Sequence, residues 1–468
     1  MALAALAGLG LRLFLVLRYP VADSGDAPFY IDLAWNWLKN GVYGFAIDGV
    51  LTPVDMRVPG YPAFLASIFT LSGKANHPGM PVMIAQALLD VVTCFAIALI
   101  AARLAPEAAR RRVTIAALWL TALCPFIANY SAVILTETLC TFLAAVAILV
   151  LLDAFRAETR AAPLAGRERG WSRWFLGGIV AGFGTLVRPE TPLLLLAAGL
   201  VLAAKCWSPL DWPKLIRGGA LMAVGLLLPL LPWAARNWRT LHEVQFLAPH
   251  YSELPGEFTP LGFSAWTRTW LWRFGDVYLS DWKVDVEEIP IGSLPARAFD
   301  SEAEKARVAN ILDTYNDTLT LSRPLDAQFR EIANERTARH PLRTWITIPL
   351  LRSLTLWFTP RVELLPVAGH LWPLWQQWDE DRPDFLTTLL LVAVNLFYIG
   401  LMLAGILLTR KNAGFWFLVV FILIRTLYFA SFVETPEPRY VLECWPAVLA
   451  FGALAFSRRQ ADSSTGSG

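Results

Sequence analysis

Ionisable and polar side chains stand at the ends of several long apolar runs of this sequence. They are Asp26, Asp55 and Arg57, then Glu137, Arg188 and Glu190, then Arg236 and Asn237, and finally Glu434, Glu437, Arg439 and Tyr440. A charged group near hydrocarbon costs free energy and usually faces the protein interior or a water-filled cavity. Each residue alone is equally compatible with an anchor at the membrane interface. The whole set on one side predicts a shared cavity.

These residue types suit chemistry on a lipid phosphate. The planar fork of arginine binds two phosphate oxygens at once, and a carboxylate accepts the proton of an attacking hydroxyl. A lipid phosphate leaves already ionised near neutral pH, so electrostatic stabilisation and one base are enough. The set therefore predicts transfer of a group from a lipid-phosphate carrier to a hydroxyl.

The composition is that of a membrane protein that crosses the bilayer many times. Hydrophobic residues make up 56% of the chain and charged residues 17%, and the mean hydropathy is +0.48, which excludes an ordinary soluble domain. The net charge of +2 is spread without a basic block, so we expect no nucleic acid partner. The 5 cysteines and 5 histidines show no disulfide framework and no metal-ligand spacing. The first apolar run has no basic leader, and we expect an uncleaved first helix.

Ten apolar runs are candidates for spanning helices, which need about 20 residues. They are Ala2–Leu17, Pro81–Ala102, Val113–Ala128, Ser131–Leu152, Trp174–Val187, Thr191–Ala204, Gly218–Ala235, Phe385–Leu408, Phe415–Phe432 and Tyr440–Phe456. Arginines and lysines in the short connections all fall on one side, which predicts that both termini are cytoplasmic. The expected fold class is an all-α polytopic membrane protein.

The stretch Trp345–Phe358 has two interpretations that preserve this orientation. It lies flat as an amphipathic helix at the interface, which Arg352 favours, or it pairs with Leu364–Trp375 as a hairpin. The first gives 10 crossings and the second gives 12.

Two polar segments are expected outside the membrane. The first loop, 18–78, contains helical patterns at Tyr30–Leu38 and Tyr61–Leu71, with prolines where helices start. The second, 238–342, is rich in turn formers and is expected to be a loop or small subdomain. The predicted organisation is a catalytic module at 1–237, this loop, a C-terminal membrane module at 343–460, and a disordered tail at 461–468.

An ordered set of short motifs resembles a known family. Asp26 is followed four residues later by Tyr30, and then come RVPGYP (57–62), LTET (135–138), LVRPE (186–190), PWAARN (232–237) and EPRY (437–440). In this order they resemble the GT-C superfamily of polyprenyl-phosphate-sugar glycosyltransferases. The likeness is to the family 39-like branch with protein O-mannosyltransferases and lipid A aminoarabinose transferases. It covers residue 2 to about residue 237 and the C-terminal region, but not the second loop. It implies a GT-C fold with a seven-helix N-terminal module and surface helices in the first loop.

The resemblance also assigns residues to roles. It implies that Asp26 is the catalytic base and Glu137 the second acidic residue of the site. Many relatives carry a second acid directly after the catalytic aspartate, where this chain has Ala27. Asp23 or Asp55 is an alternative base, although Asp23 also suits a turn, and Asp32 is expected to be solvated.

The remaining assignments concern the donor. Arg57 and Arg439, followed by Arg188 and Arg236, are the expected ligands of the lipid phosphate. The substrate pocket is expected to include Tyr30, Asp55, Tyr61, Glu190, Asn237, Glu437 and Tyr440, although the tyrosines equally suit an aromatic belt. We expect no required cofactor. Whether a divalent cation binds between Asp26 and Glu137 is left open.

These expectations describe an inverting glycosyltransferase of the cytoplasmic membrane. It takes a sugar from a polyprenyl-phosphate donor to a hydroxyl of a glycan, lipid or protein, with the site on the extracytoplasmic side and membrane lipids around it. One alternative is an O-antigen polymerase or ligase-like enzyme, whose working residues would concentrate in the second loop. Another is a lipid-linked sugar flippase or transporter, which should show repeat symmetry and charges at mid-helix depth; we expect neither.

Overall fold

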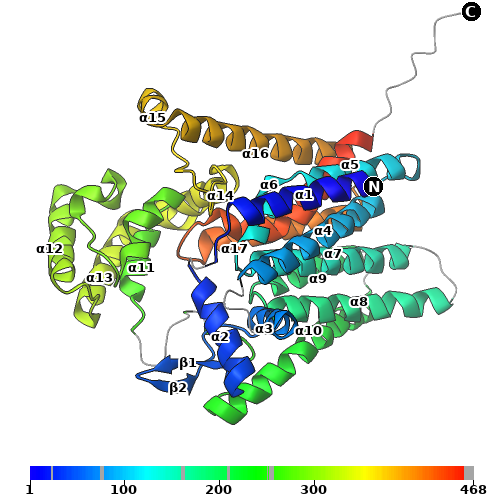
Figure 1. Ribbon diagram of the computed structural model, residues 1–468, viewed down its shortest axis with the longest axis horizontal. Coiled ribbons are helices and arrows are strands. Elements are labelled where there is room, and N and C mark those ends of the chain that lie inside the picture. The colour runs from blue at the N-terminus through cyan, green and yellow to red at the C-terminus, as the bar shows by residue number, and fades with distance from the viewer. Residues whose placement is uncertain are drawn as a thin grey trace, which may run out of the picture. The chain divides into compact units, whose positions relative to one another are not determined.

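The computed structural model describes residues 1–22, 25–73, 79–159, 164–207, 211–249, 251, 258–409 and 411–457. Asp23, the alternative base, lies outside these ranges. The chain forms two compact units (Figure 1). The first unit comprises Met1–Ser252, Pro360–Ile422 and Leu442–Gly468, and the second comprises Glu253–Thr359 and Leu423–Val441.

Each of the ten predicted apolar runs contains a helix. Nine lie in the first unit, wholly or in most of their length: α1 (Ala2–Arg18), α4 (Gly79–Leu104), α5 (Arg110–Ala122), α7 (Glu137–Thr159), α8 (Leu164–Thr185), α9 (Pro192–Cys206), α10 (Trp212–Leu241), α16 (Arg382–Leu408) and α18 (Trp445–Leu454). The tenth, α17 (Ala413–Ser431), belongs partly to each unit. In the described chain 6 helical stretches are long and apolar enough to cross a membrane, or up to 7 with one bent pair counted. The prediction of an all-α polytopic membrane protein is confirmed, and the expected 10 or 12 crossings stay a prediction.

The bent pair departs from the prediction of two continuous helices between residues 113 and 152. α5 ends at Ala122, and α6 (Pro125–Ala128) follows at a bend of 50°. Pro125 explains the break, because proline disfavours a helical residue before it and has no amide hydrogen to donate. The chain then stays irregular beyond the short helix η2 (Asn129–Ala132), and α7 begins only at Glu137.

The first loop contains the two predicted surface helices. They are α2 (Ala27–Asn40) and α3 (Gly60–Ser72). α2 ends at Gly41, which adopts a positive φ of 69° that glycine tolerates without a Cβ penalty. Between them lies a hairpin that was not expected from the sequence, β1 (Gly44–Ile47) paired antiparallel with β2 (Val50–Pro53).

Charged residues do occur at mid-helix depth, so the opposite expectation was wrong. Arg12 of α1 and Asp90 of α4 are both fully buried, and their side chains form an ion pair of 2.7 Å. Arg12 also donates to the carbonyl oxygens of Gly8 and Ala122, each at 2.9 Å. The pair joins α1, α4 and the end of α5 inside the first unit.

The second unit is a helical subdomain followed by a helix with one apolar face. Its helices are α11 (Leu261–Arg268), α12 (Glu302–Thr318), α13 (Arg323–Arg339) and α14 (Ile348–Phe358), which continues a π-helical turn, η7 (Arg343–Thr347). Trp266, Phe329 and Ile332 lie in the core of the subdomain. Short helices η3 (Phe274–Leu279), η4 (Asp281–Lys283), η5 (Ile291–Ser293) and η6 (Ala296–Ala298) connect α11 to α12.

For the stretch after α14, the choice between a flat helix and a hairpin stays a prediction. Residues 361–373 have no helical turn, and α15 (Leu374–Glu380) is a short helix before α16. The remaining short helices are η1 (Glu107–Ala109), η8 (Pro438–Cys444) and η9 (Ala455–Ser457).

Candidate active site

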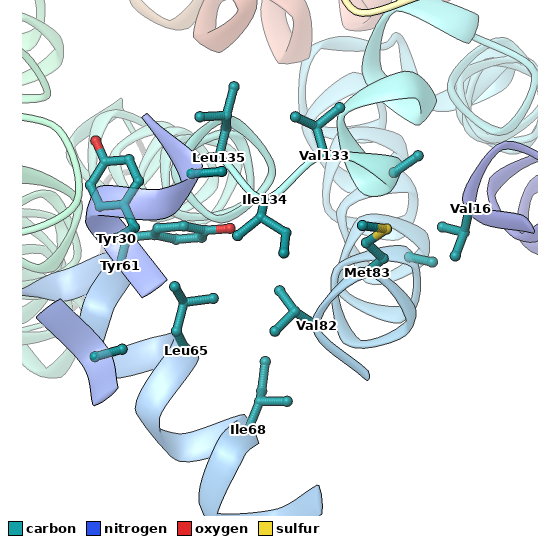
Figure 2. Close-up of a cluster of buried hydrophobic side chains, with 14 of the residues drawn as sticks. Val16, Tyr30, Tyr61, Leu65, Ile68, Val82, Met83, Val133, Ile134 and Leu135 are labelled. Carbon is teal, nitrogen blue, oxygen red and sulfur yellow. The ribbon is translucent and has the colours of Figure 1, made fainter. Parts of the chain in front are cut away.

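Two buried tyrosines from the surface helices form the centre of the candidate site. Tyr30 of α2 and Tyr61 of α3 meet edge to face, with ring centroids 5.1 Å apart. Figure 2 shows them beside Leu65 of α3 and the Val133–Leu135 segment, within one apolar cluster. The surface helices are therefore built into the core of the first unit.

The first charged pair lies at the start of α2. Asp26 directly precedes this helix, and its Oδ1 accepts a hydrogen bond from Arg57 at 2.9 Å. The side chain of Asp26 is 33% exposed and that of Arg57 is 18% exposed. The Asp26 carboxylate is therefore accessible from solvent.

The second charged pair lies at the start of α7. Glu137 is 2% exposed, and its Oε1 accepts a hydrogen bond from Arg188 at 3.0 Å. The Arg188 side chain also lies 3.6 Å from Glu443 and 3.9 Å from Glu190. Glu443 was not predicted from the sequence, although a carboxylate inside the last apolar run was the available signal.

The charges of both pairs act on the Tyr30 phenol. Burial raises the pKa of Tyr30 well above its ordinary value, and the nearby carboxylates of Asp26 and Glu137 raise it further. Arg57 and Arg188 act in the opposite direction. Four residues proposed from separate motifs thus lie within electrostatic reach of Tyr30.

The irregular segment before Glu137 is held by a side chain of α4. Gln86 is fully buried, and its amide nitrogen donates to the carbonyl oxygen of Val133 at 2.7 Å. Its amide oxygen accepts from the Tyr61 hydroxyl at 2.7 Å. Buried irregular backbone needs such partners, so Gln86 links Tyr61 to the segment that ends at Glu137. Gln86 was not among the residues predicted from the sequence.

An apolar pocket of about 720 Å³ adjoins these residues. Its walls come from α2, α3, α7, α8 and α10 and include Phe64, Leu139 and Phe183. Arg236 and Tyr43 also line it. Arg236 donates to the Tyr43 carbonyl at 2.7 Å, and the Tyr43 hydroxyl donates to the Arg57 carbonyl at 2.8 Å. The pocket therefore has a polar side that connects to the Asp26–Arg57 pair.

Two other predicted residues lie on this polar side. Asn237 is buried and accepts a hydrogen bond from Arg236 at 2.9 Å. Burial raises the pKa of Asp55, as does the nearby Glu243, while Arg236 lowers it.

The three predicted residues of the EPRY motif belong to the second unit. There Glu437 accepts from the Tyr440 hydroxyl at 2.7 Å and pairs with Arg439 at 2.6 Å. They form a local network, and their assignment to the site stays a prediction.

The two first-unit carboxylates are both bound by arginines, and a divalent cation between them stays an open prediction. Asp26 and Glu137 each bind an arginine, and the described residues include no group of three or more His, Cys, Asp or Glu side chains placed to hold a metal.

Residues 56–233 match the family model of dolichyl-phosphate-mannose-protein mannosyltransferases. A search of curated proteins gave no match. Among solved structures, the chain resembles the oligosaccharyltransferase AglB from Archaeoglobus fulgidus in complex with an inhibitory peptide and a dolichol-phosphate. The identity is 13% and the TM-score 0.51, over 97% of this chain and 49% of that one. The same enzyme with Zn and sulfate gives 14% identity and a TM-score of 0.52, over 96% and 48%.

The chain has the GT-C fold. The resemblance drawn from the motifs is thereby confirmed at the level of the fold. This GT-C chain spans about half the length of AglB. ArnT from Cupriavidus metallidurans bound to undecaprenyl phosphate is also similar, with 13% identity and a TM-score of 0.41 over 97% of this chain and 76% of that one.

Proposed function

We propose that this GT-C protein is an inverting glycosyltransferase that uses a polyprenyl-phosphate sugar. It passes the sugar to an acceptor hydroxyl on the extracytoplasmic side of the cytoplasmic membrane. The observation that supports this most directly is that the Asp26–Arg57 and Glu137–Arg188 pairs both lie within electrostatic reach of Tyr30, beside an apolar pocket.

Asp26 is the proposed catalytic base. Its carboxylate accepts the proton of the acceptor hydroxyl while the hydroxyl oxygen attacks the anomeric carbon of the sugar. The bond between that carbon and the phosphate oxygen breaks, and the electron pair leaves with the lipid phosphate. The partial exposure of Asp26 gives the acceptor access. Glu137 orients the acceptor or supports Asp26.

The carrier lipid is proposed to lie in the apolar pocket. Pockets for lipids and other apolar ligands are mostly apolar with a few placed polar groups, and this one combines Phe64, Leu139 and Phe183 with Arg236. The Tyr43 hydroxyl donates to the backbone carbonyl of Arg57, and the Arg236 guanidinium donates to the Tyr43 carbonyl. The two arginines are thereby neighbours along the chain surface around Tyr43, and the phosphate is proposed to bind between their side chains. Arginine gives paired hydrogen bonds to phosphate oxygens and stabilises the developing charge.

The test compares Asp26→Asn with Asp32→Asn. Asp32 lies on the same helix but is exposed to solvent, so its variant is a matched control. Each form is expressed in cells that lack the protein, and lipid-linked sugars and surface glycans are measured by mass spectrometry. We expect Asp26→Asn to lower transfer by at least about 100-fold and to leave a polyprenyl-phosphate sugar accumulated. Asp32→Asn should restore transfer.

Folding of each variant is checked by size-exclusion chromatography in detergent. Full transfer by a folded Asp26→Asn protein contradicts the mechanism and favours the polymerase or ligase alternative. Movement of a lipid-linked sugar across the membrane without any transfer supports a flippase.

A further inference from the structure

The helix α14 presents a continuous apolar face that the described part of the chain leaves uncovered. Its exposed residues, with those of the preceding turn, recur at helical spacing: Leu342, Trp345, Ile346, Leu350, Leu354 and Phe358. Their exposed fractions run from 48% to 70%. Soluble surfaces rarely expose apolar side chains in such an unbroken row, so this face requires an apolar environment.

The opposite face of α14 is buried in the second unit. Arg352 is fully buried and donates to the carbonyl oxygens of Leu271 at 2.8 Å and of Val433 at 2.9 Å. Thr355 donates to the carbonyl oxygen of Trp272 at 2.6 Å. The only charged side chain on the helix thus points away from the apolar face, as in membrane-embedded helices.

Contacts along α17 give the direction of α14. Arg352 binds the carbonyl oxygens of Val433 and Glu434, which lie just beyond the end of α17. Five residues later, the indole nitrogen of Trp357 donates to the Thr426 hydroxyl at 3.0 Å, inside that helix. The contacts of α14 therefore move from the end of α17 toward its interior, so the C-terminal turns of α14 lie beside this candidate membrane span.

The exposed apolar faces of the two helices belong to the same unit. Leu423 and Leu427 of α17 are 54% and 53% exposed, as expected for residues that face lipid in a spanning helix. Leu354 and Phe358 of α14 are similarly exposed, at 54% and 48%, and their helix contacts α17 through Trp357 and Thr426.

The chain after α14 returns along another candidate span, in the first unit. Arg361 donates to the amide oxygen of Asn395 at 3.2 Å, about 20 Å along α16 from its first residue. The backbone nitrogen of Ala368 then donates to the carboxylate of Asp384 at 2.7 Å, near the start of α16. This limb therefore runs from the middle of α16 back to its start, and only Thr359 and Pro360 join it to Phe358.

We propose that residues 341–381 form a re-entrant segment, in which α14 descends into one leaflet and residues 361–373 return to the same side. The acyl chains of that leaflet contact the exposed face of α14. Irregular backbone at membrane depth is tolerated where protein surrounds it. In this limb Arg361 is buried and residues 362–365 are partly buried, whereas the exposed Pro366 and Ala368 lie toward the start of α16.

The test measures depth along α14 in the full-length protein. The native cysteines are replaced, and single cysteines are placed at Leu342, Leu350, Leu354 and Phe358. Each variant carries a nitroxide label in vesicles of phosphatidylcholine and phosphatidylglycerol. Accessibility to oxygen is compared with accessibility to a water-soluble nickel chelate. Ala306→Cys on α12 is the exposed control and Leu427→Cys is the control for lipid.

A re-entrant helix predicts a steady increase in depth, with the label at Phe358 on the order of 10 Å deeper than that at Leu350. Equal depth at all four positions means a helix that lies flat, and greatest depth at Leu350 with shallow ends means a crossing helix. Nickel accessibility equal to that of Ala306→Cys means that water covers the face. Each of these three results overturns the proposal.

Discussion

The backbone nitrogen of Gly60 donates to the carbonyl oxygen of Leu186 at 2.6 Å. This bond joins the RVPGYP motif at the start of α3 to the LVRPE motif after α8. A Cβ atom on Gly60 would lie 2.5 Å from the Leu186 oxygen and 3.0 Å from a Val187 methyl group. The contact holds α3, and with it Tyr61, against the loop that carries Arg188.

Gly60→Ala should therefore destabilise the protein by roughly 1–3 kcal/mol, because the added methyl overpacks a backbone contact. Transfer activity should fall with it. Thermal unfolding in detergent measures the first effect. Gly199→Ala on α9 is the control, since a Cβ atom added there would meet no described heavy atom within 4 Å and alanine favours the helix. Equal stability of the two variants would show that the Gly60 contact can relax.

Gln86 supports a second prediction. Gln86→Leu conserves size but removes the acceptor for Tyr61 and the donor to Val133. Each buried polar group left without a partner costs about 1–3 kcal/mol, so we expect a lower unfolding temperature and weaker transfer. Gln328→Leu, on the exposed side of α13, should change neither. Wild-type behaviour of Gln86→Leu would contradict the role assigned to Gln86.

The helices were more predictable than the site because each apolar run carries its own signal. The end of α6 and the start of α7 could not be predicted, because the mostly apolar stretch Tyr130–Leu135 has the same sequence pattern in a helix as in irregular backbone. In the second loop, α12 was not predicted because the turn-forming residues were taken to indicate irregular structure. Its N-terminal signal was present: the Ser301 hydroxyl caps the helix by accepting from the Glu304 amide at 3.2 Å. The Asp26–Arg57 and Glu137–Arg188 pairs join residues 31 and 51 positions apart. Hydrophobic periodicity carries no information on such contacts.

The buried Arg12–Asp90 pair gives a third prediction. Removing one partner of a buried pair costs about 3–5 kcal/mol. Asp90→Leu should be the more costly change, because arginine cannot lose its proton, whereas an aspartate without its partner can become neutral. Arg12→Leu/Asp90→Leu should be more stable than Asp90→Leu alone. Thermal unfolding of the three variants in detergent tests this order.

The control for that cycle is the Arg103–Asp153 pair, whose side chains are 34% and 26% exposed. Its removal should cost about 0–1 kcal/mol. If Asp90→Leu costs no more than Asp153→Leu, the buried pair does not stabilise the first unit.

Asp281 makes the stability of the second unit depend on pH. Burial raises the pKa of this carboxyl from 3.8 to about 6, against the hydrogen bond from Ser280 and the charge of Arg352. Between these two values the folded state binds the proton more tightly than the unfolded state does. Raising the pH through this window therefore lowers the contribution of Asp281 to the free energy of unfolding, and this contribution no longer changes well above about 6.

Hydrogen exchange of the α11 amides, corrected for the intrinsic rate, measures this effect at several pH values from about 4 to about 8. The Thr267 hydroxyl on α11 donates to the Asp281 carboxylate at 3.3 Å, so this helix reports the titration. Asp281→Asn should remove the slope that Asp281 contributes, and Asp313→Asn on the exposed side of α12 should keep it. Identical slopes in wild type and Asp281→Asn would mean that Asp281 titrates as it does in the unfolded chain.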